Sequence, residues 1–208
     1  MDQKDSLAPA DIKKLIALPL FAAMIAVGSY TSIPVGPVPV VMQNFFVLLA
    51  GLVLGPSAAG ASACLFLLMG VAGLPVFAGA TGGIARFAAP SAGFLVSYPF
   101  GAWLCGFLSG SGQGAQAEKG AEEIPNKKKP RGLILYGKDL CAVLAAQTLI
   151  FAIGLFWLKL RLGLDWPGTL GAGLLPFLPG DIMKTLAAPA LAPILRGILQ
   201  KEGIGTGR

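Results

Sequence analysis

The chain has 208 residues, of which 55% are hydrophobic and only 12% are charged, and its mean hydropathy is +0.74. Ordinary soluble domains have about 45–50% apolar and about 25% charged residues, so a water-soluble fold would be unable to bury this much apolar surface. The composition therefore excludes a soluble enzyme and predicts an integral membrane protein. The net charge of +6 fits the lipid bilayer as a partner, and we expect no binding to nucleic acid.

The sequence offers little chemistry for catalysis. It contains no histidine, which removes Ser–His and Cys–His pairs and the usual zinc ligands. The cysteines stand singly in apolar surroundings, at Cys64, Cys105 and Cys141. The glycines form no Walker A loop. We expect no metal, no cofactor and no use of ATP by the chain itself.

Long apolar stretches divide the chain into membrane spans, because an α-helix needs about 20 residues to cross about 30 Å of hydrocarbon. We predict an all-α integral membrane fold, a six-transmembrane-helix bundle between residues 15 and 200. Residues 1–14 form an N-terminal segment, a polar loop occupies about 109–132, and 201–208 form a C-terminal tail. The six spans are expected at residues 15–31, 38–54, 57–73, 93–108, 140–158 and 177–199.

The distribution of lysine and arginine predicts the orientation, since cytoplasmic loops are enriched in both. Placing the N-terminus inside leaves four of the 16 basic residues on the outer side: Arg86, Lys159, Arg161 and Lys184. Both termini, and the loop at about 109–132, are therefore expected to be cytoplasmic. The inner side then holds Lys4, Lys13, Lys14, Lys119, Lys127, Lys128, Lys129, Arg131, Lys138, Arg196, Lys201 and Arg208.

Charges near the spans mark candidate functional residues, because a charge at a helix centre costs about 2.5–3.5 kcal/mol on insertion scales. Asp181 and Lys184 begin the last span, and their spacing puts them on one helix face. They either form a local ion pair that caps the helix or point into a cavity and bind a ligand. Arg161 and Asp165 are typical of an interfacial rim, and we expect no role for them in the site.

Arg86 lies in a stretch, residues 73–90, that is too rich in glycine for a helix facing lipid. Irregular backbone at membrane depth is tolerated only where protein or a water-filled cavity covers it. This segment is expected to fold over or into the bundle. Arg86 then either snorkels to headgroups or, with Lys184 and Asp181, leaves one net positive charge in an apolar chamber. Such a chamber suits a small, largely apolar monoanion that can also donate hydrogen bonds.

Two weaker patterns have more than one interpretation. Gln43 and Asn44 in the second span either bind ligand or join neighbouring helices. Ala22 and Ala26 form a small-xxx-small pattern, which permits close helix approach inside the bundle or to another protein.

Several motifs together resemble the BioY family of biotin transporters, over residues 13–200. They are IPVGPVPV at 33–40, Gln43, LLAG at 48–51, GLPVFAG at 73–79 and PFLPGDIMK at 176–184. Many relatives read GPTGGY where this chain has APSAGF at 89–94.

The resemblance implies a substrate (S) component of an energy-coupling-factor (ECF) transporter in the bacterial cytoplasmic membrane. Its substrate would be biotin, and its partners a transmembrane coupling subunit and a pair of ABC-type ATPases. Asp181 would accept from the ureido N–H groups, Lys184 would donate to the ureido oxygen or neutralise a carboxylate, and Arg86 would bind the valerate carboxylate. Gln43 and Phe77 complete the expected ligand site. Ala22 and Ala26 would contact the coupling subunit.

Three other functions stay open on the sequence. The same scaffold would also serve as an S component for another small vitamin. An intramembrane enzyme would use Asp181 and Lys184 as acid and base, although such an enzyme usually needs a second carboxylate, a metal cluster or a nucleophile. A purely structural subunit would not need polar residues that converge on an outer chamber.

Overall fold

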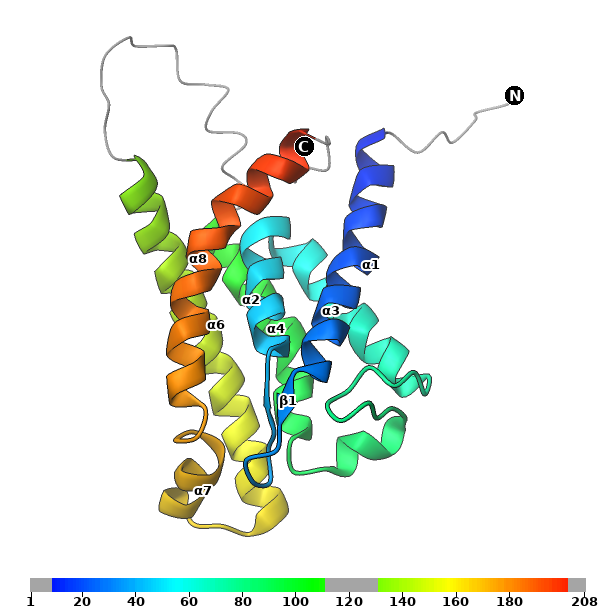
Figure 1. The fold of residues 1–208 in the computed structure, drawn as a ribbon, viewed down its shortest axis with the longest axis vertical. Helices are drawn as coiled ribbons and strands as arrows, with labels where there is room; N and C mark the ends of the chain where they lie inside the picture. Colours follow the sequence, from blue (N-terminus) through cyan, green and yellow to red (C-terminus); the bar gives the residue numbers. More distant parts are fainter. Residues whose placement is uncertain (1–8, 111–130, 202–208) are drawn as a thin grey trace.

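The structure is a computed structural model that describes residues 9–110 and 131–201. Its helices run back and forth along one direction (Figure 1), so that α1 begins and α8 ends at the same end of the bundle. The predicted loop at about 109–132 lies mostly outside the described residues, as do residues 1–8 and 202–208. The main helices are α1 (Pro9–Tyr30), α2 (Gln43–Leu54), α3 (Pro56–Val71), α4 (Ala92–Ser109), α6 (Arg131–Leu162), α7 (Trp166–Gly173) and α8 (Leu178–Lys201).

Each predicted span overlaps an apolar helix in the described part of the chain. Three of these helices are long and apolar enough to cross a membrane: α4, α6 from Leu133 onward, and α8. Three further apolar helices are shorter, and they comprise α1 from Ile16 onward, α2 and α3. Large hydrophobic side chains such as Ile16, Leu133 and Ile194 are more than half exposed on the outer faces, as expected of helices solvated by lipid.

A short β-hairpin joins α1 to α2. Strand β1 (Ser32–Ile33) pairs antiparallel with β2 (Val40–Val41), Ser32 opposite Val41. The proline- and glycine-containing stretch at 34–39 makes the turn between the two strands. The second helix is shorter than predicted, because residues 38–42 belong to the hairpin and its approach to Gln43. We call the end of the bundle that carries this hairpin and α7 the hairpin end (Figure 1).

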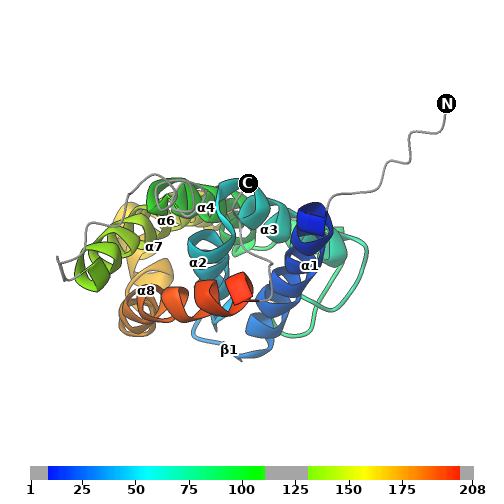
Figure 2. The same ribbon diagram turned by 90° about the horizontal axis from the view of Figure 1, so that it is seen from above.

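Helix α2 is the centre of the bundle. Every residue from Gln43 to Leu54 except Phe46 is buried, and Figure 2 shows the other helices arranged around it. Close packing relies on small residues. A Cβ atom on Gly51 would lie 2.6 Å from Cys105 Cβ of α4, and one on Gly101 would lie 2.7 Å from the Ile150 side chain of α6.

A buried ion pair ties three helices together at the end opposite the hairpin. Arg196 of α8 binds the carboxylate of Asp139 of α6 with two nitrogens, at 2.8 and 3.1 Å. It also donates to Leu52 O of α2 at 2.7 and 2.9 Å. The helical partner of that carbonyl would be the N–H of residue 56, which is a proline and has none. Arg196 therefore satisfies a carbonyl that the α2–α3 turn leaves unpaired.

Two elements differ from the sequence expectation. Helix α6 has 32 residues and begins well before the predicted 140–158. Helix α7 was not predicted. Asp165 caps it by accepting from Gly168 N at 2.9 Å, and a proline occupies its first turn. The segment around Arg86 is irregular as predicted, with one 3-10 helix, η1 (Ile84–Ala88).

We predict that Asp139→Asn destabilises the protein by about 3–5 kcal/mol, because it leaves the partly buried Arg196 without its counter-charge. Thermal unfolding of the detergent-solubilised protein measures this as a lower Tm. Lys201→Ala, an exposed change near the same end, is the control. An unchanged Tm for Asp139→Asn would contradict the stabilising role of the ion pair.

Candidate ligand-binding site

A chamber that is partly open to the surface lies in the half of the bundle nearer the hairpin end, where hairpin residues line it. Sites for small molecules are mostly apolar clefts with a few convergent polar groups. The lining residues come from the hairpin, α2, the loop before α4, α4, α6 and the start of α8. The polar and charged ones are Gln43, Asn44, Arg86, Ser91, Tyr98, Gln147, Asp181 and Lys184.

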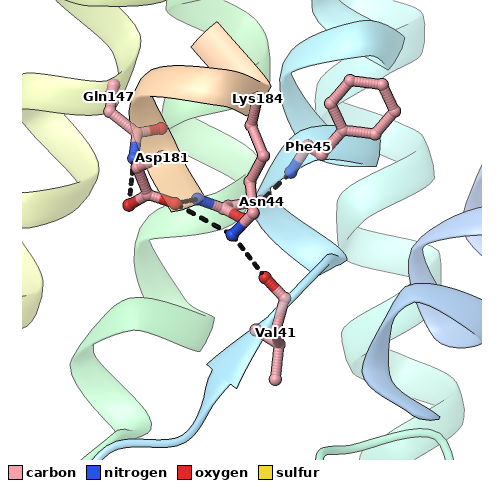
Figure 3. A network of polar contacts seen from close by, with 6 residues as sticks. All are labelled: Val41, Asn44, Phe45, Gln147, Asp181 and Lys184. Carbon is pink, nitrogen blue, oxygen red and sulfur yellow. Dashed lines mark hydrogen bonds and ion pairs between the residues drawn. The ribbon is translucent and has the colours of Figure 1, made fainter. Parts of the chain in front are cut away.

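Asp181 is the acidic group of the chamber, and three side chains donate to its carboxylate. Asn44 Nδ2 and Lys184 Nζ reach Oδ1 at 3.1 and 2.9 Å, and Gln147 Nε2 reaches Oδ2 at 2.9 Å (Figure 3). Asp181 is only 5% exposed. It lies in the first turn of α8, where the helix dipole favours a negative charge.

The ammonium group of Lys184 is also surrounded by hydrogen-bond partners. Its Nζ donates to Val41 O at 2.7 Å, to Asp181 Oδ1 at 2.9 Å and to Asn44 Oδ1 at 3.2 Å. These three bonds use all three N–H donors of a lysine. Asn44 therefore bridges both charges, with its NH₂ on Asp181 and its oxygen on Lys184 (Figure 3).

Three phenylalanines form an apolar part of the chamber wall. The ring centroids of Phe94, Phe151 and Phe177 lie 6.0–6.4 Å apart, and Phe94 and Phe177 stack with an interplanar angle of 20°. The rings come from α4, α6 and the residue before α8. Such a wall accepts flat or cyclic apolar groups.

Three buried side-chain atoms in the described part of the chain have no hydrogen-bond partner, and all belong to residues that line this chamber. They are Gln43 Nε2, Arg86 Nε and Gln147 Oε1. Burying an unpaired polar group costs about 1–3 kcal/mol. The chamber thus presents two donors and one acceptor to a ligand. With Asp181 and Lys184 neutralising each other, Arg86 leaves a net charge of +1.

Comparisons with known proteins support the sequence resemblance. The family model described as "BioY family" matches residues 1–201. The chain belongs to the BioY family. A relative named as the probable biotin transporter BioY of Pyrococcus horikoshii is 35% identical over 89% of this chain and 97% of its own length. The biotin transporter BioY of Rhizobium etli is 34% identical over 86% of this chain and 90% of its own length.

The fold of this BioY family member also resembles a solved structure. That structure is described as the S-component for biotin from an ECF-type ABC transporter, and it matches with a TM-score of 0.71 and 27% identity. The match covers 91% of this chain and 92% of the other. The predicted family is therefore confirmed. These relatives are transporters, so the expectation that the chain is not an enzyme is confirmed as well.

The structure brings together four of the five residues expected to bind ligand. Gln43, Arg86, Asp181 and Lys184 line one chamber, and their binding roles stay predictions. Phe77 does not line it. Its ring is fully buried against Phe66 and Phe87, at centroid distances of 5.5 and 5.9 Å.

Phe77 instead anchors its own loop. A Cβ on Gly70 would lie only 2.0 Å from the Phe77 ring, so the ring packs directly against the α3 backbone. Its main chain also pairs with Thr81, through bonds of 2.9 and 3.3 Å. The Phe77 ring therefore packs its loop against α3, and its binding role stays a prediction.

Ala22 and Ala26 lie inside the bundle, and their contact with a coupling subunit stays a prediction. Ala22 is fully buried and Ala26 is 8% exposed, and both pack in the core of the bundle. The outward face of α1 carries Leu20 and Val27 instead, which are 49% and 63% exposed. Of the two interpretations of the small-residue pattern, the structure therefore supports close packing inside the bundle.

Sequence reasoning missed several lining residues. Gln147 was hidden in the middle of an apolar span, and a polar residue at that depth was the available signal. Phe94, Phe151 and Phe177 come from three different segments, and no local sequence pattern shows that their rings meet. Arg161 and Asp165 do not line the chamber.

We predict that Asp181 and Lys184 are energetically coupled. Lys184→Met leaves a buried carboxylate unpaired and is expected to destabilise by about 3–5 kcal/mol. Combining it with Asp181→Asn removes that charge, so the double variant should recover most of the loss. Thermal unfolding of the four proteins in the cycle measures the coupling. Strictly additive effects would contradict the prediction.

Proposed function

We propose that this chain is the biotin-binding S component of an ECF-type transporter. Family membership supports the class of ligand, since the relatives carry the name biotin transporter. The observation on which the proposal rests is the set of unpartnered polar atoms that line the chamber beside a buried ion pair.

The chamber matches the chemistry of biotin group by group. Biotin has an apolar bicyclic body, a ureido ring with two N–H donors and one carbonyl, and a valerate carboxylate. The phenylalanine wall suits the bicycle, Gln147 Oε1 suits a ureido N–H, and Gln43 Nε2 suits the ureido oxygen. The net charge of +1 suits a monoanion.

Asp181, Lys184 and Arg86 carry the charged contacts in this proposal. Asp181 accepts from the ureido N–H groups, and Lys184 donates to the ureido oxygen or offsets a carboxylate. All three N–H donors of Lys184 are already used, so the ligand replaces one of its bonds, whereas among the described residues Asp181 Oδ2 accepts only from Gln147 and can accept another bond. Arg86 binds the valerate carboxylate, because a guanidinium can bind two carboxylate oxygens at once.

The proposal also covers the membrane, the orientation of the chain in it and the partner proteins. Six helices cross the cytoplasmic membrane of a bacterium, both termini are cytoplasmic, and the hairpin end faces outward. The helix directions support this, since Arg131, Lys138, Arg196 and Lys201 belong to the end where α6 begins and α8 ends. The partners are a transmembrane coupling subunit and ABC-type ATPases, which would supply the energy.

Another small vitamin is the nearest alternative ligand. A neutral vitamin would leave Arg86 without a counter-charge, and one without N–H donors would leave the Gln147 oxygen unpaired. Biotin has both a carboxylate for Arg86 and N–H donors for the Gln147 oxygen.

We predict that the purified, detergent-solubilised protein binds labelled biotin. Asp181→Asn and Lys184→Ala should each weaken binding by at least about a hundredfold, because each removes hydrogen bonds to a charged group. Arg86→Ala should weaken it about ten- to a hundredfold. Equilibrium binding to the isolated subunit measures these losses without requiring assembly with partners.

Asp165→Asn is the matched control, since Asp165 caps α7 and does not line the chamber. It should leave affinity unchanged. If folded wild-type protein does not bind biotin but binds another vitamin, the ligand assignment is overturned.

The proposed orientation has its own test. A green fluorescent protein fused to the C-terminus should fluoresce, because it folds in the cytoplasm, whereas an alkaline phosphatase fusion at the same position should be inactive. Fusions in the hairpin after residue 36 should give the reverse result. An active C-terminal phosphatase fusion would contradict the orientation.

A further inference from the structure

Two side chains at the hairpin end of α6 hold the loop that carries Arg86. Trp157 Nε1 donates to Ala89 O at 3.2 Å, and Arg161 Nε donates to Ala88 O at 3.1 Å. A second guanidinium nitrogen of Arg161 bonds the same oxygen. Residues four apart share a helix face, so α6 presents both groups to the loop together.

These two carbonyls lie two and three residues after Arg86 in the chain. Ala89 N donates to Arg86 O at 3.1 Å, and Arg86 N donates to Gly83 O at 3.2 Å. Gly83 N in turn donates to Gly70 O at the end of α3, at 2.7 Å. The backbone of Arg86 is therefore held by α3 on one side and by α6 on the other.

The side chain of Arg86 has no comparable support. Its Nε is buried without a hydrogen-bond partner among the described residues, although the residue lines the chamber. The direction of the guanidinium therefore depends on where the backbone of η1 is held. Loss of the α6 contacts would remove one of the supports of that backbone, leaving the α3 side, the bond from Ala92 N to Ala89 O and the packing of Phe87 on Phe77.

We propose that Trp157 and Arg161 are positioning residues that aim Arg86 at the carboxylate of the ligand. The proposal rests on the proposed function, in which Arg86 binds that carboxylate. Neither residue lines the chamber. Their effect should therefore appear in the preference for a ligand acid over its neutral ester, and not in recognition of the rest of the ligand.

Lys159 provides a matched control for charge. It lies on the same end of α6 and has the same charge as Arg161, but it packs over the Trp166 ring at 5.5 Å and makes no bond to the loop. A general electrostatic effect of this rim on an anionic ligand would appear in Lys159→Ala. A positioning effect would not.

The experiment compares affinities for biotin and for biotin methyl ester in full-length protein. The variants are Arg161→Ala, Arg161→Lys, Trp157→Phe and Lys159→Ala, each also combined with Arg86→Ala. Arg161→Ala should weaken biotin binding about tenfold and leave ester binding unchanged. Arg161→Lys should restore part of the loss, and Lys159→Ala should have no effect. In the Arg86→Ala background, Arg161→Ala should cost nothing further.

Hydrogen exchange of ligand-free protein supplies a readout that does not depend on biotin. Amides of residues 84–92 should exchange faster in Arg161→Ala than in wild type, and those of α2 should not. Unchanged exchange in the loop overturns the positioning role. Equal weakening for acid and ester, or full additivity with Arg86→Ala, also overturns it. Wild type that fails to bind biotin refutes the proposed function instead, while the exchange result still decides whether α6 holds the loop.

Discussion

The buried pair of Asp181 and Lys184 is the constraint on which the rest of the structure depends. Removing two charges from water costs several kcal/mol per ion, and their attraction offsets this only where other hydrogen bonds complete the site. Here Asn44, Gln147 and Val41 O supply those bonds. The pair therefore requires α2, α6 and α8 to meet at one point, and it places the chamber there.

Two cationic side chains of α8 bind backbone carbonyls at the two ends of α2. Lys184 bonds Val41 O just before α2, and Arg196 bonds Leu52 O in its last turn. The separation along the chain between Lys184 and Arg196 nearly equals the separation between the two carbonyls they bind. At 1.5 Å per residue, parallel helices with matching spacings stay in register. Since α2 is much shorter than the bilayer, α8 fixes its depth in the bundle.

Much of this arrangement could be predicted from the sequence, because its signals are local. Apolar runs marked the helices, the glycine-rich stretch at 73–90 marked the irregular loop, and the spacing of Asp181 and Lys184 put them on one face. Other features depend on which surfaces meet. Phe77 and the pair of Ala22 and Ala26 have the same local sequence whether they face a ligand, a partner or the core. Only tertiary packing decides this, and it turned all three inward.

The bond between Arg196 and Leu52 O couples the evolution of two distant parts of the chain. The arginine and the carbonyl are 144 positions apart, and the carbonyl needs an outside donor only because residue 56 is a proline. A descendant with an ordinary residue at 56 could close that helical turn with its own backbone, which would relax the requirement for a cation at 196. Asp139 would still need Arg196 as its counter-charge, so the arginine should be lost freely only where both that carboxylate and the proline at 56 are absent.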